Sequence, residues 1–277
     1  MSTSKKKIGV NAMTVVKLPP ADHLSLIKDA GFDAFFNYFD YKTEAWANEA
    51  AKKGLIFTSI HAPSSREQHI WNGTEKGEIE MKKLFDCLAD CHRFEIPVMV
   101  LHTMNGFDAA TPQAPTSKGL DAYARLVDEA CRLGVTLAFE NTEREEFLAA
   151  VMEKFKDVPE VAFCYDSGHE HCYQNSDMLA LYGSKLCHTH FDDNFGKTGD
   201  VITWYDDSHL PPFDGTVDWR RIRNTLDTIG YEGVYSFELT MKNKPERHTH
   251  GRYEQMPPDE YYKLIAQRAK RFADGDF

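Results

Sequence analysis

The sequence has no apolar run long enough to span a bilayer. Its first residues, MSTSKKKIGV, are charged and lack the apolar segment that marks a signal peptide. No two cysteines are spaced as CxxC, and a chain of 277 residues can bury a large core without disulfides. We therefore expect a cytoplasmic protein without membrane contact, whose six cysteines are reduced.

Long basic stretches of the kind that contact DNA are also missing, and the net charge is −11. Nucleic-acid binding depends on clustered basic residues that neutralise phosphates, so the composition argues against a nucleic-acid partner. No glycine-rich phosphate loop follows the first expected strand, which disfavours a doubly wound dinucleotide-binding sheet.

Short apolar segments alternate with segments whose apolar residues recur at helical spacing, such as LFDCLADCHRF and YARLVDEACRL. Strict alternation of this kind, repeated eight times without a linker, predicts a single-domain (β/α)₈ TIM barrel formed by residues 1–277. The eight expected strands are 7–13, 33–39, 56–62, 98–104, 136–142, 161–167, 186–193 and 234–240.

The stretch VAFCYDSGHEH, residues 161–171, reads as a buried strand that ends in polar residues. Because side chains alternate along a strand, its bulky residues should pack under the helices, and its small residues and Asp166 should face the barrel interior. The same alternation points Glu140, His190 and Glu238 inward from three other strands. The last four strands therefore aim four polar side chains at one space.

Three buried carboxylates in one space would repel one another, and a divalent cation removes that problem. Any one of these residues alone is better explained by a buried salt bridge or a hydrogen-bonded core position. Four of them at consecutive strand ends favour a site, because catalytic residues of barrels come from the ends of several strands. An oxygen-rich donor set suits Mn²⁺, Mg²⁺ or Co²⁺ better than a thiolate-rich zinc site does.

Other polar residues are expected at the same end of the barrel. Each alone is more often a structural residue, but together they could hold additional ions or line a polar substrate pocket. These residues are His61, His102, His169, Asp207 and His209.

Two tryptophans and one basic segment lie in connections that follow strands. Trp71 and Trp204 could stack on a sugar ring or an aglycone, or could simply pack their loops. In the segment RHTHGR, Arg247 or Arg252 could hold a substrate phosphate, with a solvated mobile loop as the alternative.

Several segments together resemble a known family. FENTEREE, CYDSGHEH, CHTHFDD, DDSHLPPFDGTVDW and GYEGVYSFEL are similar to successive signatures of the xylose isomerase-like TIM barrel superfamily. Within it, the sugar (phosphate) isomerase/epimerase branch, including ketose 3-epimerases, is the best match. The chain departs from free-ketose epimerases in one respect, since FDDNFGK lacks the arginine that often follows the metal-binding histidine.

The resemblance implies a small-molecule sugar or sugar phosphate as substrate and a homo-oligomeric assembly. It also implies that Glu140 and Glu238 face each other across the sugar. One carboxylate would remove the proton beside a carbonyl, and the other would return a proton to the opposite face, through a cis-enediolate. Glu146 and His169 match substrate-contact positions of these enzymes. The implied cofactor is one divalent ion, Mn²⁺ before Mg²⁺, Co²⁺ or Zn²⁺, held by Glu140, Asp166, His190 and Glu238.

Three alternatives share the fold. A metal-dependent dehydratase or 3-keto-glycoside lyase would begin with the same deprotonation and end in elimination. An apurinic-site endonuclease of the same superfamily holds three zinc ions with nine ligands, and this chain has suitable residues at all nine places, although its acidic charge argues against DNA. A non-catalytic binding module would have lost a base or a ligand, and none is missing.

Overall fold

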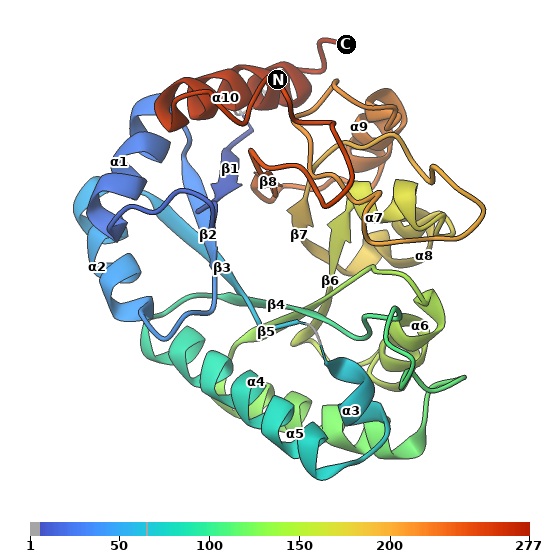
Figure 1. Ribbon diagram of the computed structural model, residues 1–277. Helices are drawn as coiled ribbons and strands as arrows, with labels where there is room; N and C mark the ends of the chain where they lie inside the picture. Colours follow the sequence, from blue (N-terminus) through green and yellow to red (C-terminus); the bar gives the residue numbers. More distant parts are fainter. Residues whose placement is uncertain (1–5, 65) are drawn as a thin grey trace.

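Eight parallel strands form one sheet that curves into a nearly closed barrel (Figure 1). The computed structural model describes residues 6–64 and 66–277. The strands are hydrogen-bonded in the order β7-β6-β5-β4-β3-β2-β1-β8, so neighbours in sequence are neighbours in the sheet. All eight expected strands and the (β/α)₈ fold are confirmed. The strands are β1 (Ile8–Asn11), β2 (Ala34–Tyr38), β3 (Ile56–His61), β4 (Val98–His102), β5 (Thr136–Glu140), β6 (Val161–Asp166), β7 (Leu186–His190) and β8 (Tyr235–Phe237).

The helices lie outside the ring of strands and cover it (Figure 1). Many end where their apolar periodicity stops at a glycine; the helix that ends at Leu133, for example, is closed by Gly134 with a φ of 67°. The helices are α1 (Pro20–Ala30), α2 (Thr43–Lys53), α3 (Glu67–Trp71), α4 (Glu75–Arg93), α5 (Ser117–Leu133), α6 (Glu145–Lys154), α7 (Ser167–Cys172), α8 (Met178–Tyr182), the 3₁₀ turn η1 (Gly183–Lys185), α9 (Trp219–Thr228) and α10 (Pro258–Asp274).

The two faces of the strands form two separate cores. Phe163 and Tyr165 of β6 belong to the large cluster between strands and helices. Cys164, between them, packs instead with Val100 and Ala138 in a small cluster of its own. This partition confirms the alternation inferred from the sequence, and it leaves the inner face to small residues and to polar residues at the strand ends.

The barrel closes differently between β7 and β8 than elsewhere. Only an isolated bridge, Phe191 to Phe237, joins these two strands within the described residues. The Phe191 amide donates to the Ser236 carbonyl at 2.8 Å, and the Glu238 amide donates to the Phe191 carbonyl at 3.1 Å. Next to the bridge, the Thr189 hydroxyl oxygen accepts the Ser236 amide at 3.0 Å. A side chain thus takes the place of a backbone carbonyl at this join.

Across residues 6–64 and 66–277, no helix combines the length and apolar character needed to cross a membrane.

Candidate metal centre

Four side chains from the ends of β5, β6, β7 and the segment after β8 meet inside the barrel. Glu140, Asp166, His190 and Glu238 each offer one ligand atom within 4.8 Å of the others. His190 Nδ1 lies 3.0 Å from Glu140 Oε1 and 2.9 Å from Glu238 Oε2. All four residues are buried. The structure therefore brings together the four residues that strand alternation pointed at one space.

The carboxylate oxygens of this primary cluster fit a divalent ion. Glu140 Oε2, Asp166 Oδ2 and Glu238 Oε2 are buried and make no hydrogen bond within the described part of the chain. Leaving such oxygens unsatisfied in a protein interior is costly, and a cation compensates for it. Three carboxylates and one imidazole form a donor set suited to Mn²⁺, Mg²⁺, Co²⁺ or Zn²⁺.

The pKa shifts within the primary cluster also favour a bound cation. Burial raises the pKa of Asp166 to about 7. Burial opposes ionisation of Glu140 as well, but His190 and His102 hold the pKa of this carboxyl well below its usual value. Burial would lower the pKa of His190, yet Cys164, Glu140 and Glu238 raise it well above its usual value. The carboxylates thus draw a proton onto His190, and a divalent cation would meet the same demand more fully.

Asp166 shows why the stretch 161–171 has its unusual end. Asp166 is the last residue of β6 and also caps α7, because its Oδ1 accepts the His169 amide at 2.6 Å. The cap holds one carboxylate oxygen and leaves Oδ2 directed elsewhere. One residue therefore ends the strand, starts the helix and supplies an oxygen to the cluster.

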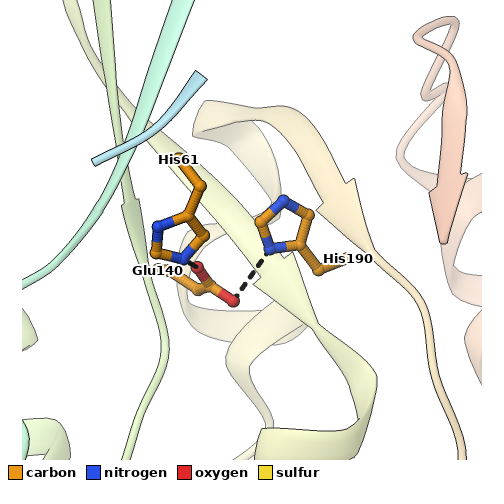
Figure 2. A group of neighbouring side chains, drawn as sticks. All are labelled: His61, Glu140 and His190. Atoms are coloured by element: carbon orange, nitrogen blue, oxygen red, sulfur yellow. Dashed lines mark hydrogen bonds and ion pairs between the residues drawn. The ribbon is translucent and has the colours of Figure 1, made fainter. Parts of the chain in front are cut away.

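Two histidines extend the cluster around Glu140. His61 Nε2 and His102 Nε2 each lie 3.3 Å from Glu140 Oε2. Figure 2 shows Glu140 between the rings of His61 and His190. His61 Nδ1 is 2.7 Å from the Ala62 carbonyl and can donate to it, so Nε2 is the ring nitrogen directed at Glu140.

A third group forms next to the primary cluster. Asp207 Oδ2 lies 2.9 Å from His209 Nε2 and 3.6 Å from His169 Nε2. The nearby Lys244 Nζ is 3.3 Å from the same oxygen. Nine of the ten histidine and carboxylate candidates from the sequence therefore lie in one connected network, and Glu146 is the exception.

Other candidates from the sequence lie outside this network. Trp71 must be corrected: its indole is fully buried, donates to the Thr103 carbonyl at 2.7 Å, and packs edge-on against Phe147, so it serves the core between helices and strands. Glu146 is exposed and pairs with Arg144 at 2.5 Å, so its role as a substrate contact stays a prediction.

The remaining candidates, which lie in loops, are Trp204, Arg247 and Arg252. Trp204 is 40% exposed, and its ring lies 5.3 Å from Lys244 Nζ, which places it at the rim of the network. Arg247 pairs with Asp206 at 2.9 Å, and Arg252 pairs with Asp214. Both arginines thus have carboxylate partners within the protein.

The structure adds three residues that the sequence did not indicate. The Tyr38 hydroxyl donates to Glu238 Oε1 at 2.6 Å. Asp192, fully buried, has an oxygen 3.6 Å from His209 Nδ1. Glu143 is buried, its carboxylate accepts the Gly106 amide, and burial raises its pKa to about 8. Only Tyr38 carried a usable signal, since it ends β2 in the same orientation as the inward-facing Phe36.

Comparison with known proteins identifies the fold. The family model described as "Xylose isomerase-like TIM barrel" matches residues 24–267. A relative, the uncharacterized protein y4fM of Sinorhizobium fredii, is 32% identical over 124 residues, which are 44% of this chain and 37% of that protein. The match thus spans well under half of that relative's length.

Solved structures resemble nearly the whole chain. The 3-keto-D-glucoside 4-epimerase YcjR from E. coli has a TM-score of 0.71 at 16% identity, covering 96% of this chain and 99% of that one. D-psicose 3-epimerase from Clostridium cellulolyticum H10 has a TM-score of 0.69 at 15% identity, with 98% of both chains covered. The IOLI protein, solved with a zinc atom, has a TM-score of 0.73 at 18% identity, with 98% of both chains covered. At these identities the likeness shows a shared fold.

Proposed function

The chain belongs to the xylose isomerase-like TIM barrel family, and from this premise we propose that it is a divalent-metal-dependent sugar epimerase or isomerase. One observation carries the proposal: Glu140 Oε1 and Glu238 Oε2 approach the same nitrogen of His190, at 3.0 and 2.9 Å. Two carboxylates held so close around one point are the arrangement that proton removal and return require.

The residues of the primary cluster have two roles, which are to hold the ion and to transfer protons. Glu140, Asp166, His190 and Glu238 would hold the ion, whose charge would polarise a substrate carbonyl and acidify the adjoining C–H bond. Glu140 and Glu238 are ionised at neutral pH, because His190 holds the pKa of both carboxyls below the usual value despite their burial. One of them takes the proton, and the other delivers a proton to the opposite face.

The substrate class follows from charge and from the neighbours in fold. Arg247 and Arg252 are paired with Asp206 and Asp214, so a phosphate would have to compete with these carboxylates. This pairing favours an uncharged keto-sugar or keto-glycoside over a sugar phosphate. The related folds include an epimerase of a 3-keto-glucoside and a 3-epimerase of a ketose, both of which act on sugars.

Solvent deuterium exchange tests the proposal. The protein is incubated in D₂O with Mn²⁺ and a panel of ketoses and 3-keto-glycosides, and the products are examined by NMR. We expect deuterium at the carbon beside the carbonyl of the substrate, and loss of this exchange in Glu140→Gln and Glu238→Gln. Glu153→Gln is the matched control, because Glu153 is exposed on α6, and it should exchange like wild type. Absence of exchange across the panel with metal-loaded protein would contradict the proposal, and an unsaturated product would assign the lyase or dehydratase reaction instead.

A second candidate, a multi-metal phosphoester hydrolase such as an apurinic-site endonuclease, is favoured by one observation. The nine polar residues form overlapping groups that share Glu140 and His169. The net charge of −11 opposes it, because such a substrate must be drawn in by basic residues. Cleavage of an abasic-site duplex by the zinc-loaded protein would support this candidate.

A further inference from the structure

The group formed by His169, Asp207 and His209, here called the second cluster, has the orientation of a metal site. His169 Nδ1 lies 2.9 Å from the Asn141 carbonyl, and His209 Nδ1 lies 3.1 Å from the Glu238 carbonyl. Each Nδ1 can therefore donate to a carbonyl, which leaves Nε2 as the ring nitrogen that a neutral imidazole would offer to an ion. Both Nε2 atoms point at Asp207 Oδ2, at 3.6 and 2.9 Å.

A side chain already brings positive charge to this point. Lys244, in the segment between β8 and α10, places Nζ 3.3 Å from Asp207 Oδ2. The side chain of Lys244 is only 19% exposed, and Nζ lies 5.3 Å from the centre of the Trp204 ring. A carboxylate on one side and an aromatic face on the other hold the ammonium in place.

We propose that the Lys244 ammonium takes the place of a metal ion at the second cluster. The two clusters together then bind one divalent ion, not two. A tethered ammonium needs no fixed coordination geometry, and at this distance it repels a divalent ion that would share Asp207. Lys244 thereby keeps this network a one-ion site and keeps His169 and His209 from serving as ion ligands. This inference rests on the proposed function only for the ion in the primary cluster.

Counting bound Co²⁺ tests the proposal. Wild-type protein and Lys244→Met are stripped with a chelator and dialysed to equilibrium against a series of Co²⁺ concentrations. Methionine keeps the length and the apolar stem of lysine without its charge. We expect wild type to bind one ion and Lys244→Met to bind two. The dissociation constant for the second ion should be at least tenfold lower in Lys244→Met than in wild type. Lys244→Gln should behave like Lys244→Met, which separates loss of charge from a packing effect.

Two controls locate the additional ion. Lys242→Met lies in the same segment, is exposed, and should leave the count at one. Adding Asp207→Asn to Lys244→Met should remove the second ion, and Asp207→Asn alone should not change the wild-type count.

The possible outcomes separate this inference from the proposed function. An unchanged count in both Lys244 variants, or a wild-type protein that loses an ion on Asp207→Asn, would overturn the role of Lys244. A wild-type protein that binds no ion, with a gain of one in Lys244→Met, would support the role of Lys244 and contradict the metal dependence of the proposed function.

Discussion

The Tyr38 hydroxyl, at the end of β2, donates a 2.6 Å hydrogen bond to Oε1 of Glu238, which follows β8 two strands away in the sheet. Burial and Glu238 raise the pKa of Tyr38 well above its usual value, so the phenol remains a donor across the working pH range. A donor to the ionised carboxylate stabilises that form. Tyr38 therefore positions Glu238 and leaves Oε2 to face His190.

Removal of this donor should weaken the reaction without removing the base. In Tyr38→Phe we expect the exchange rate to fall about tenfold to hundredfold, since a hydrogen bond to a charged group contributes about 1.5–3 kcal/mol. The acidic limb of the pH–rate profile should move to higher pH. Tyr41→Phe, at a residue 67% exposed, is the control and should leave the profile unchanged. An unshifted profile in Tyr38→Phe would contradict the positioning role.

Asp166→Asn should mainly reduce metal affinity. Asparagine can still accept a hydrogen bond from the His169 amide and cap α7. It removes the negative charge at Oδ2, which makes no hydrogen bond within the described residues. Bound metal stabilises a fold by about 2.7 kcal/mol at a hundredfold excess over the Kd. We expect a chelator to lower the Tm of the wild type and to leave that of Asp166→Asn nearly unchanged. An equal metal content in the two proteins would remove Asp166 from the ligand set.

Glu143 should make the protein less stable in alkali. Its pKa is about 8 in the folded chain, because of burial, and about 4.5 when unfolded, so the folded state binds the extra proton between these values. Stability from this group is complete below pH 4.5 and declines as the pH rises to 8. Glu143→Gln should remove the decline and raise the free energy of unfolding at pH 8 by about 2–4 kcal/mol. Urea titrations at pH 6 and pH 8 measure the difference, with exposed Glu146→Gln as control.

His23 should make the protein less stable in acid. It is buried against Tyr262, with Nε2 2.7 Å from the hydroxyl, and burial lowers its pKa to about 4. The unfolded chain, with a pKa near 6.5, binds more protons between these values, so stability is full above pH 6.5 and falls as the pH drops towards 4. The slope from this one group is at most about 1.4 kcal/mol per pH unit. His23→Gln should flatten the slope, and exposed His248→Gln should not; equal slopes would contradict the assignment.

The fold and the primary cluster could be predicted because both depend on the two-residue period of a strand. Glu140, Asp166 and Glu238 face inward because small side chains two residues earlier in the chain do so as well. His190 follows the same rule from β7. Nothing beyond local spacing was needed to place these four residues in one space.

The loop residues could not be predicted in this way, because their positions depend on contacts distant in sequence. Trp71 is buried because Gly119 of α5 has no side chain: a Cβ there would lie 2.1 Å from the indole ring. Arg144, with a φ of 63°, turns the chain between Glu143 and Glu146. The carboxyl group near the network is consequently that of Glu143, not that of Glu146.

An ion in the primary cluster would also stabilise the join between β7 and β8. His190 and Glu238 each adjoin a residue of the single bridge that links these strands, so an ion held by both would fasten the barrel where its backbone ladder is thinnest. Ion binding would then reinforce a join that backbone hydrogen bonds already make. Amide hydrogens of Phe191 and Glu238 should exchange more slowly when the ion is bound, while those of the β4–β5 ladder should hardly respond.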